Sequence, residues 1–371
     1  MKKLTDICDI QYGYAFDSKC FTEEPLYPPL VRIRDVKRGY SETYYSGDYS
    51  EEYLITSGDL LIGMDGEFNI ARWKSDRALL NQRVCKLTAK KGTNEEYLRF
   101  AMAKVLKEIE QKTAFVTVKH LSAKELNKLY LNVPELSKQN KIAGILSRLE
   151  NIIDVRRQEL EKLDELIKAR FVEMFGNPRI NPNKYPTKLI KDTCIVITGN
   201  TPSRKVHEYY GDAIEWIKTD NIVSSLLYPT VASESLSDSG KAVGRAVDAG
   251  AILMACIAGS VASIGRVCIT DREVAFNQQI NAIVPKEYDV RFLHALLQIS
   301  KDYLVEDINM SLKGIISKSK LEEKEFIVPS MEEQVGFADF VKQIDKSKVA
   351  IQAALDKTQL LFDSLMQKYF G

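Results

Sequence analysis

Four basic residues lie close together near the N-terminus: Arg32, Arg34, Lys37 and Arg38. The first two alternate with apolar residues, which predicts a strand over residues 30–36 that carries basic side chains on itself and on the turn after it. Guanidinium and ammonium groups hold phosphates, and guanidinium groups also read the edge of guanine. This stretch is therefore a candidate nucleic-acid contact, and solvated surface charge without a partner is the alternative.

The second half of the chain carries different polar residues at the matching place. Lys218, Thr219 and Asn221 follow a short apolar run there. Different side chains at matched positions would read different bases. Lys119 and Lys313 each precede a predicted helix, where phosphate binding is favourable. These five residues join the candidates, again with plain surface charge as the alternative.

Motifs for catalysis are missing from the sequence. It contains no G-x-x-x-x-G-K-[ST] or G-x-G-x-x-G loop, no H-E-x-x-H and no G-x-S-x-G elbow. Residues 177–179 lack the second proline and the aromatic residue of the Asn-Pro-Pro-aromatic site of amino-methyltransferases. Asp65-Gly66-Glu67 is a turn or a metal site, and we expect a turn because its counterpart, residues 258–260, has no carboxylate. We expect no catalytic, cofactor-binding or metal-binding residues.

Charge is unevenly distributed along the chain. Averaged over the 371 residues, the net charge of +1 argues against a nucleic-acid partner, because phosphate binding depends on Lys and Arg. Residues 41–67 contain seven acids and no base, whereas residues 99–141 contain nine Lys or Arg against four acids. The mean charge therefore conceals basic regions that are able to face an anionic partner.

The chain of 371 residues is longer than one domain usually is, so its length predicts two domains.

The sequence indicates neither a signal peptide nor a membrane-spanning helix. Two acids within the first nine residues interrupt the apolar stretch that a signal peptide needs. The longest run without charge, residues 249–265, is rich in Gly, Ala and Ser and is shorter than a spanning helix. Six cysteines form no C-x-x-C pair, so we expect reduced structural thiols. We expect a cytoplasmic protein with no membrane partner.

The chain repeats one plan twice. Lys3-Leu4 leading to Gly13 matches Lys188-Leu189 leading to Gly199 with one residue inserted, and Asn81-Gln82 matches Asn277-Gln278. Further matches follow in the same order, namely Pro134 and Gln139 with Pro329 and Gln334, and Phe175-Gly176 with Phe370-Gly371. Between these anchors each half is predicted to hold short strands and turns, with helices near residues 95–110 and 290–305. The extra residues of the second copy precede its Asn-Gln pair.

Each copy ends in a long amphipathic helix. Steps of four and three residues run from Ile142 to Met174 and from Phe337 to Tyr369, which is the pattern of a heptad seam. About 34 residues at 1.5 Å each give a rod of roughly 50 Å, longer than a half of this size needs for its own core. Two such helices are predicted to pair with each other.

These features together resemble the DNA-specificity (S) subunit of type I restriction–modification systems. The resemblance rests on the residues from Gly199 to Arg204, on Tyr210 to Ile222, on the Asn-Gln pair, on the two Pro-x-x-x-x-Gln helix starts and on the helix end at residues 163–176. It spans the whole chain. The first half has Tyr12-Gly13-Tyr14-Ala15-Phe16 where the pattern has Gly-x-Thr-Pro-Ser, so it departs from the family there.

The resemblance implies an α+β fold in which two repeated mixed α/β target-recognition domains, each reading half of a bipartite double-stranded DNA site, are separated by two long antiparallel coiled-coil helices. The predicted segments are 1–136, 137–177, 178–331 and 332–371, in the order domain, helix, domain, helix. Modification subunits would supply S-adenosylmethionine-dependent methylation and restriction subunits would supply ATP-driven cleavage, so this chain would bind neither cofactor and catalyse neither reaction.

The resemblance adds Ser203 and Arg204 to the candidate contacts. The rivals are a coiled-coil scaffold that binds only proteins and a modification enzyme, which the missing motifs count against. The complete set of predicted DNA-binding residues is Arg32, Arg34, Lys37, Arg38, Lys119, Ser203, Arg204, Lys218, Thr219, Asn221 and Lys313.

Overall fold

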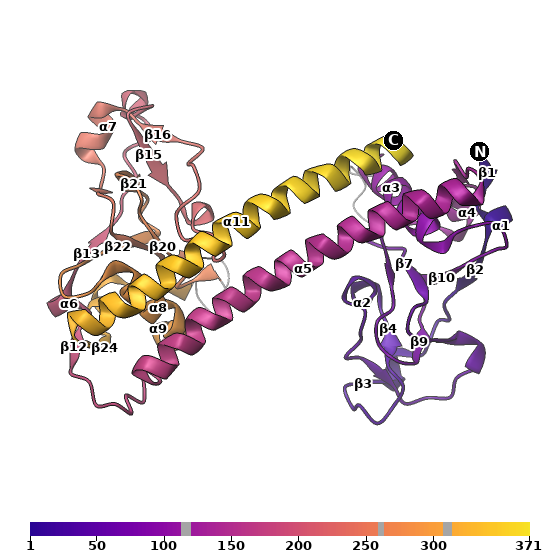
Figure 1. Ribbon diagram of the computed structural model, residues 1–371, viewed down its shortest axis with the longest axis horizontal. Helices are drawn as coiled ribbons and strands as arrows, with labels where there is room; N and C mark the ends of the chain where they lie inside the picture. Colours follow the sequence, from indigo (N-terminus) through magenta and orange to yellow (C-terminus); the bar gives the residue numbers. More distant parts are fainter. Residues whose placement is uncertain (113–119, 259–262, 307–313) are drawn as a thin grey trace. The chain divides into compact units, whose positions relative to one another are not determined.

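The computed structural model describes residues 1–112, 120–258, 263–306 and 314–371, and these divide into two compact units (Figure 1). The first unit comprises Met1–Arg157 and Ala353–Gly371, and the second comprises Gln158–Gln352. Two long helices, α5 (Leu136–Phe175) and α11 (Met331–Phe370), each contribute to both units. The predicted segments separate globular parts from helices, whereas each compact unit combines a globular part with portions of both helices.

The first unit is a mixed α+β structure around a four-stranded sheet with the order β2-β10-β7-β8. The same unit also contains a three-stranded sheet, β4-β9-β6, and the two-stranded sheet β3-β5. Its elements are β1 (Lys2–Lys3), α1 (Leu4–Ile7), β2 (Cys8–Tyr12), η1 (Ser18–Cys20), β3 (Phe21–Thr22), β4 (Leu30–Val31), α2 (Ile33–Arg38), β5 (Tyr44–Tyr45), η2 (Glu51–Tyr53), β6 (Leu54–Ile55), β7 (Leu60–Gly63), β8 (Asn69–Arg72), β9 (Ala78–Leu80), β10 (Val84–Ala89), α3 (Glu95–Lys112), α4 (Ala123–Leu126) and β11 (Tyr130–Leu131).

The second unit repeats this plan around a four-stranded sheet with the order β13-β22-β18-β20. A five-stranded sheet, β14-β16-β15-β21-β17, takes the place of the smaller sheets. Its elements are β12 (Thr187–Leu189), α6 (Ile190–Thr193), β13 (Cys194–Thr198), η3 (His207–Tyr209), β14 (Tyr210–Gly211), β15 (Ile214–Ile217), η4 (Thr219–Asn221), β16 (Ser235–Leu236), α7 (Asp238–Val243), β17 (Ala246–Val247), β18 (Ile252–Ala255), β19 (Ile257–Ala258), β20 (Val267–Ile269), β21 (Val274–Phe276), β22 (Ile280–Pro285), α8 (Val290–Ile299), α9 (Lys301–Val305), β23 (Gly314–Ile315), α10 (Lys318–Glu322) and β24 (Glu325–Ile327).

The predicted repeat is confirmed, with a correction to its register at the start. Leu4 begins α1 as Ile190 begins α6, and Cys8 begins β2 as Cys194 begins β13. Matching Lys3-Leu4 to Lys188-Leu189 was therefore wrong by one residue, and nothing is inserted before the paired glycines Gly13 and Gly199. The single-residue slip arose because Lys-Leu occurs in both copies, whereas the helix start depends on the strand pairing that precedes it.

The paired glycines meet the same backbone in the two units. A Cβ atom on Gly13 would lie 2.0 Å from the carbonyl oxygen of Asn81, and one on Gly199 would lie 2.2 Å from that of Asn277. Gly13 donates its N–H to Val84 O as Gly199 donates to Ile280 O. The Gly and the Asn-Gln anchors of the repeat are thus two sides of one close backbone contact, where a side chain has no room.

The first core combines the four-stranded sheet and α3 with both long helices. Leu146 of α5 is fully buried, and Phe362 of α11 packs with its ring centroid 6.0 Å from that of Phe100 of α3. Tyr97 and Phe370 lie 5.1 Å apart in the same way, so the end of α11 lies beside α3 (Figure 1). An early α5 residue and a late α11 residue in one core mean that the helices run antiparallel here.

The second core is built by the opposite portions of the same helices. Phe171 and Phe175 of α5 and Phe337 of α11 are fully buried against Phe292 of α8. Phe171 stacks on Phe292 at 5.5 Å. The four-three seam predicted on α5 runs through Arg170 and Met174, but the fully buried side chains at this end are Phe171 and Phe175, because here the helix packs on a sheet domain as well as on α11. Gly176, with φ 74, ends α5 as the sequence indicates.

Candidate nucleic-acid interface

The basic stretch of the first unit is helical, so the strand predicted over residues 30–36 was wrong beyond Val31. Strand β4 ends there, and α2 begins at Ile33. The backbone N–H of Arg32 donates to the Asp35 carboxylate at 2.9 Å, and Gly39 ends the helix with φ 81. A carboxylate at the third helical position and a glycine after the last turn are strong local signals, and they outweigh the alternation of apolar residues.

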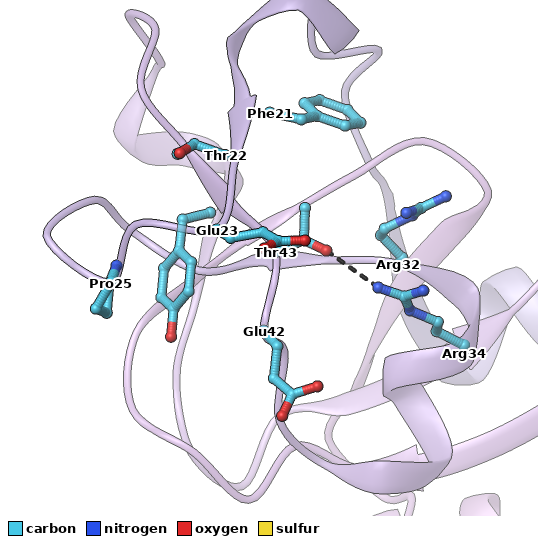
Figure 2. A pocket seen from close by; sticks show the side chains of 9 residues that line it. Phe21, Thr22, Glu23, Pro25, Arg32, Arg34, Glu42 and Thr43 are labelled. Atoms are coloured by element: carbon cyan, nitrogen blue, oxygen red, sulfur yellow. Dashed lines mark hydrogen bonds between the residues drawn. The ribbon is translucent and has the colours of Figure 1, made fainter. Parts of the chain in front are cut away.

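Arg32 and Arg34 line an open hollow of about 800 Å³ in the first unit. Both arginines lie on one side of it, with Glu42 and Pro25 across from them (Figure 2). Arg34 donates from Nη2 to the hydroxyl of Thr43 at 3.2 Å, and its Nε lies 3.4 Å from Asp35 Oδ1. The complete lining is Phe21, Thr22, Glu23, Pro25, Arg32, Arg34, Glu42, Thr43 and Tyr44.

The other two basic residues of this stretch, Lys37 and Arg38, do not line the hollow, and each is paired with an acid. Lys37 Nζ lies 3.2 Å from Glu67 Oε1, and Arg38 Nη1 lies 3.9 Å from Glu42 Oε2. All four side chains of these pairs are largely exposed, so each ion pair is screened by water and is easily exchanged for another anion. Contact of Lys37 and Arg38 with DNA stays a prediction.

In the second unit the predicted contacts gather around one acid. Glu234 accepts from Lys218 Nζ, and Arg204 Nη2 lies 2.6 Å from its other oxygen. The hydrogen bond from Lys218, aided by Arg204, holds the pKa of Glu234 below its usual range. The Arg204 guanidinium also lies over the Tyr210 ring at 4.4 Å and the Trp216 ring at 5.1 Å. Lys218 and Arg204 are therefore bound by groups of their own unit.

Asn221 has a structural position. It is buried, its Oδ1 accepts the Lys218 N–H at 2.9 Å, and its Nδ2 donates to Thr230 Oγ1 at 3.0 Å and to Val231 O at 3.2 Å. It thus does for η4 what Asp35 does for α2. A base contact by Asn221 stays a prediction, and it would require the side chain to leave three hydrogen bonds.

The remaining predicted residues are more simply placed. Ser203 is exposed in the loop before η3. Thr219 opens η4 and its carbonyl accepts from Arg266 Nη2 at 3.1 Å. Lys119 and Lys313 lie outside the described residues, so their predicted phosphate contacts stay predictions. The structure therefore brings Arg32 and Arg34 together in one hollow, and Arg204 and Lys218 together in another place.

Sequence reasoning missed Thr43 and Glu234, which decide how these basic side chains are held. Neither residue belongs to a motif. Each lies on a segment whose backbone is hydrogen-bonded to the strand that directly precedes one of the basic residues. It also missed a charged cluster in which Arg83 Nη1 lies 2.6 Å from Asp65 Oδ2 and 3.2 Å from His120 Nδ1. Asp65 is engaged in this cluster, and the turn expected at residues 65–67 stays a prediction.

In the described part of the chain, no group of three or more His, Cys, Asp or Glu is arranged to hold a metal ion. No helix in the described ranges has an apolar stretch long enough to cross a bilayer. The six cysteines are free, and five are buried. Burial raises the pKa of the Cys8 thiol to about 12, which suits a structural thiol.

Comparison with known proteins places the chain in a family. The family model described as type I restriction modification DNA specificity domain matches residues 1–165 and 182–359. The EcoBI type I restriction enzyme specificity subunit of Escherichia coli is 28% identical over 406 residues, covering 99% of this chain and 84% of that protein.

Solved structures share the fold. The S subunit of a type I restriction–modification system from M. genitalium has a TM-score of 0.57 at 14% identity, over 100% of this chain and 95% of that chain. A chain from work on complex assembly and conformational transition of the type I R-M system has a TM-score of 0.53 at 16% identity, over 100% and 96%. The two family matches coincide with the two copies of the repeat, which confirms the resemblance seen in the sequence: this protein belongs to the family of type I restriction modification DNA specificity domains.

Proposed function

We propose that this chain is the sequence-reading, non-catalytic subunit of a type I restriction–modification complex and that each of its units reads one half of a bipartite double-stranded DNA site. The relatives named above are specificity subunits, which supports a role without catalysis. The observation that carries the proposal is the repeat itself: one backbone plan presents Arg32 and Thr43 in the first unit and Lys218 and Glu234 at the corresponding places in the second. Unlike side chains on the same frame suit two unlike half-sites.

The partners follow from the same proposal. Modification and restriction subunits dock on the specificity subunit and bind S-adenosylmethionine and ATP, so neither cofactor is needed by this chain. The long helices support docking, because α5 exposes apolar side chains such as Ile152 and Val155 and α11 exposes Leu360 and Leu361. The complex acts on DNA in the cytoplasm.

A segment exchange tests modular reading. Replacing residues 178–331 with the corresponding residues of a relative should change one half of the methylated sequence in a host and leave the other half as it was. The matched control replaces residues 1–136 and should change only the other half. Methylation sites are mapped across the host genome with and without each chain. A change in both halves from either exchange contradicts modular reading.

The alternative of a scaffold that binds only proteins has a distinct outcome. For that alternative, the chain assembled with its modification subunits would show no salt-sensitive DNA binding, and genome methylation would not depend on which segment is present. Salt titration of binding adds a second measurement, because phosphate contacts make log K fall linearly with log salt concentration.

A further inference from the structure

Thr43 and Glu234 occupy the same position in the two units. The N–H of Leu30 in β4 donates to Thr43 O at 2.7 Å, and the N–H of Trp216 in β15 donates to Glu234 O at 3.0 Å. Leu30 and Trp216 are themselves matched, because β4 pairs in parallel with β9 at Leu79 as β15 pairs in parallel with β21 at Ala275. One backbone position therefore carries a hydroxyl in the first unit and a carboxylate in the second.

The carboxylate engages the basic side chains of the second unit. Glu234 holds Lys218 on one oxygen and Arg204 on the other, and the two cations also lie over Trp216. Lys218 matches Arg32, since both precede the helical turn that Asn221 or Asp35 caps. In this unit the charge at the matched position is neutralised within the domain.

The first unit has no carboxylate at this position, and Arg34 uses the hydroxyl instead. The Nη2–Thr43 hydrogen bond and the nearby Asp35 carboxylate fix the plane of the guanidinium from two directions. A guanidinium has five N–H donors in one plane, so these two neighbours leave the edge with Nη1 to offer. The Arg34 side chain is 54% exposed, so this edge is accessible from the hollow.

The lining of the hollow favours a base edge over a phosphate. Two guanidinium groups stand in it together with the carboxylates of Glu23 and Glu42 (Figure 2). Carboxylates repel a phosphate, but the major-groove edge of a G·C pair has both kinds of group that this lining matches. Guanine offers O6 and N7 as acceptors for an arginine, and cytosine offers its N4 amino group as a donor to Glu.

We propose that Arg34 reads a guanine through the major groove in the half-site of the first unit, and that Thr43 is a specificity-determining residue because it positions Arg34 without neutralising it. This inference rests on the proposed function and adds the base chemistry of one half-site. Arg32 stands beside Arg34 in the hollow and supports the same base pair. In the second unit, Glu234 at the matched position pairs with both Lys218 and Arg204.

The test uses the chain assembled with its modification subunits and DNA duplexes that carry the methylated sequence found in the host. Each guanine of the first half-site is replaced in turn with 7-deazaguanine, which lacks the N7 acceptor. The wild-type complex should lose affinity at one position. Arg34→Lys, which keeps the charge but not the two-pronged geometry, should reduce discrimination between guanine and other bases at that position by about 5- to 150-fold and be less sensitive than wild type to 7-deazaguanine there.

Variants at residue 43 test its assigned role. Thr43→Glu should reproduce the loss of discrimination, because the introduced carboxylate competes for Arg34 as Glu234 competes for Lys218 and Arg204. Thr43→Ser keeps the hydroxyl and should retain the guanine preference. Arg77→Lys is the matched control, since Arg77 is an exposed arginine of the same unit that does not line the hollow. Thermal unfolding of each variant checks that it is folded.

Three outcomes would overturn the inference: a first half-site without guanine, equal 7-deazaguanine sensitivity in wild type and Arg34→Lys, or a uniform loss of affinity with a smaller salt slope in Arg34→Lys. The last would assign Arg34 to a phosphate. If the wild-type complex prefers no sequence at all, the proposed function fails instead, and that result is recognised without any variant.

Discussion

Gln139 and Gln334 make the same three hydrogen bonds in the two units. Gln139 Oε1 accepts the N–H of Asn94 at 2.8 Å, and its Nε2 donates to the carbonyls of Gly92 and Pro134. Gln334 Oε1 accepts the N–H of Asp289 at 2.9 Å, and its Nε2 donates to the carbonyls of Glu287 and Pro329. Each amide links the start of a long helix, α5 or α11, to the loop before α3 or α8.

Removing either amide should destabilise its unit. Both glutamines are 1% exposed, so Gln334→Ala leaves one buried N–H and two carbonyls without their partner. We expect a loss of roughly 2–4 kcal/mol in the free energy of unfolding, measured by denaturant titration. Gln343→Ala, at an exposed position on the same helix, is the control and should change little. Equal stability of Gln334→Ala and wild type would contradict the structural role.

Alanine at the close backbone contact should be disruptive. Gly13→Ala places a methyl group against Asn81 O, and backbone atoms cannot move aside as a flexible side chain can. We expect a loss of more than about 2 kcal/mol in the free energy of unfolding. The contrasting variant is Gly144→Ala in α5, where nothing lies within 4 Å of the new Cβ and helix propensity should add up to about 1 kcal/mol. The same sign for both variants would argue against the close contact.

The caps of the two units are predicted to be interchangeable only in part. Asn221→Asp retains the oxygen that accepts the Lys218 N–H, as Asp35 does for Arg32, but loses the donor to Thr230 and Val231. It should therefore be less stable than wild type and more stable than Asn221→Ala, which should lose about 1–3 kcal/mol. Thermal unfolding ranks the three proteins. If Asn221→Ala is fully stable yet fails to bind DNA, the residue reads DNA instead of capping η4.

His294 should make the second unit sensitive to mild acid. Burial lowers the pKa of His294 to about 4, and the nearby charges of Lys348 and Arg291 act in the same direction. Between pH 6.5 and 4 the unfolded chain binds a proton at this residue that the folded chain does not, so the free energy of unfolding falls as pH falls. From pH 7.5 to 5 this amounts to about 2 kcal/mol. His294→Gln should show a smaller pH dependence by that amount; parallel curves for the two proteins would refute the assignment.

Lys37 tests the electrostatic part of DNA binding. Its ion pair with Glu67 is exposed on both sides and is readily exchanged for a phosphate. Lys37→Gln should lower the salt slope of DNA binding by about one and weaken all sequences alike. Glu67→Gln frees the lysine and should strengthen binding at low salt. A changed sequence preference in Lys37→Gln would instead make Lys37 a base contact.

The sequence by itself determined the long helices, the twofold plan and the family. Helices α5 and α11 lie within two residues of the predicted segments at their N- and C-terminal ends, because an apolar residue every three or four positions is a local pattern that only a helix satisfies. The Pro-x-x-x-x-Gln segments were found as a repeated motif, although their reason, a buried amide shared by two loops, was not visible without the fold.

The tertiary structure decided which basic side chains are available. Arg34 and Arg204 look alike in the sequence, yet one is oriented by Thr43 and the other is paired with Glu234. This difference depends on which loop residue the register of the strands brings opposite each arginine, and residue spacing carries no information about that register. The sequence gives the charge of each side chain. Its orientation and its partner depend on contacts between distant parts of the chain, and only the folded backbone sets those contacts.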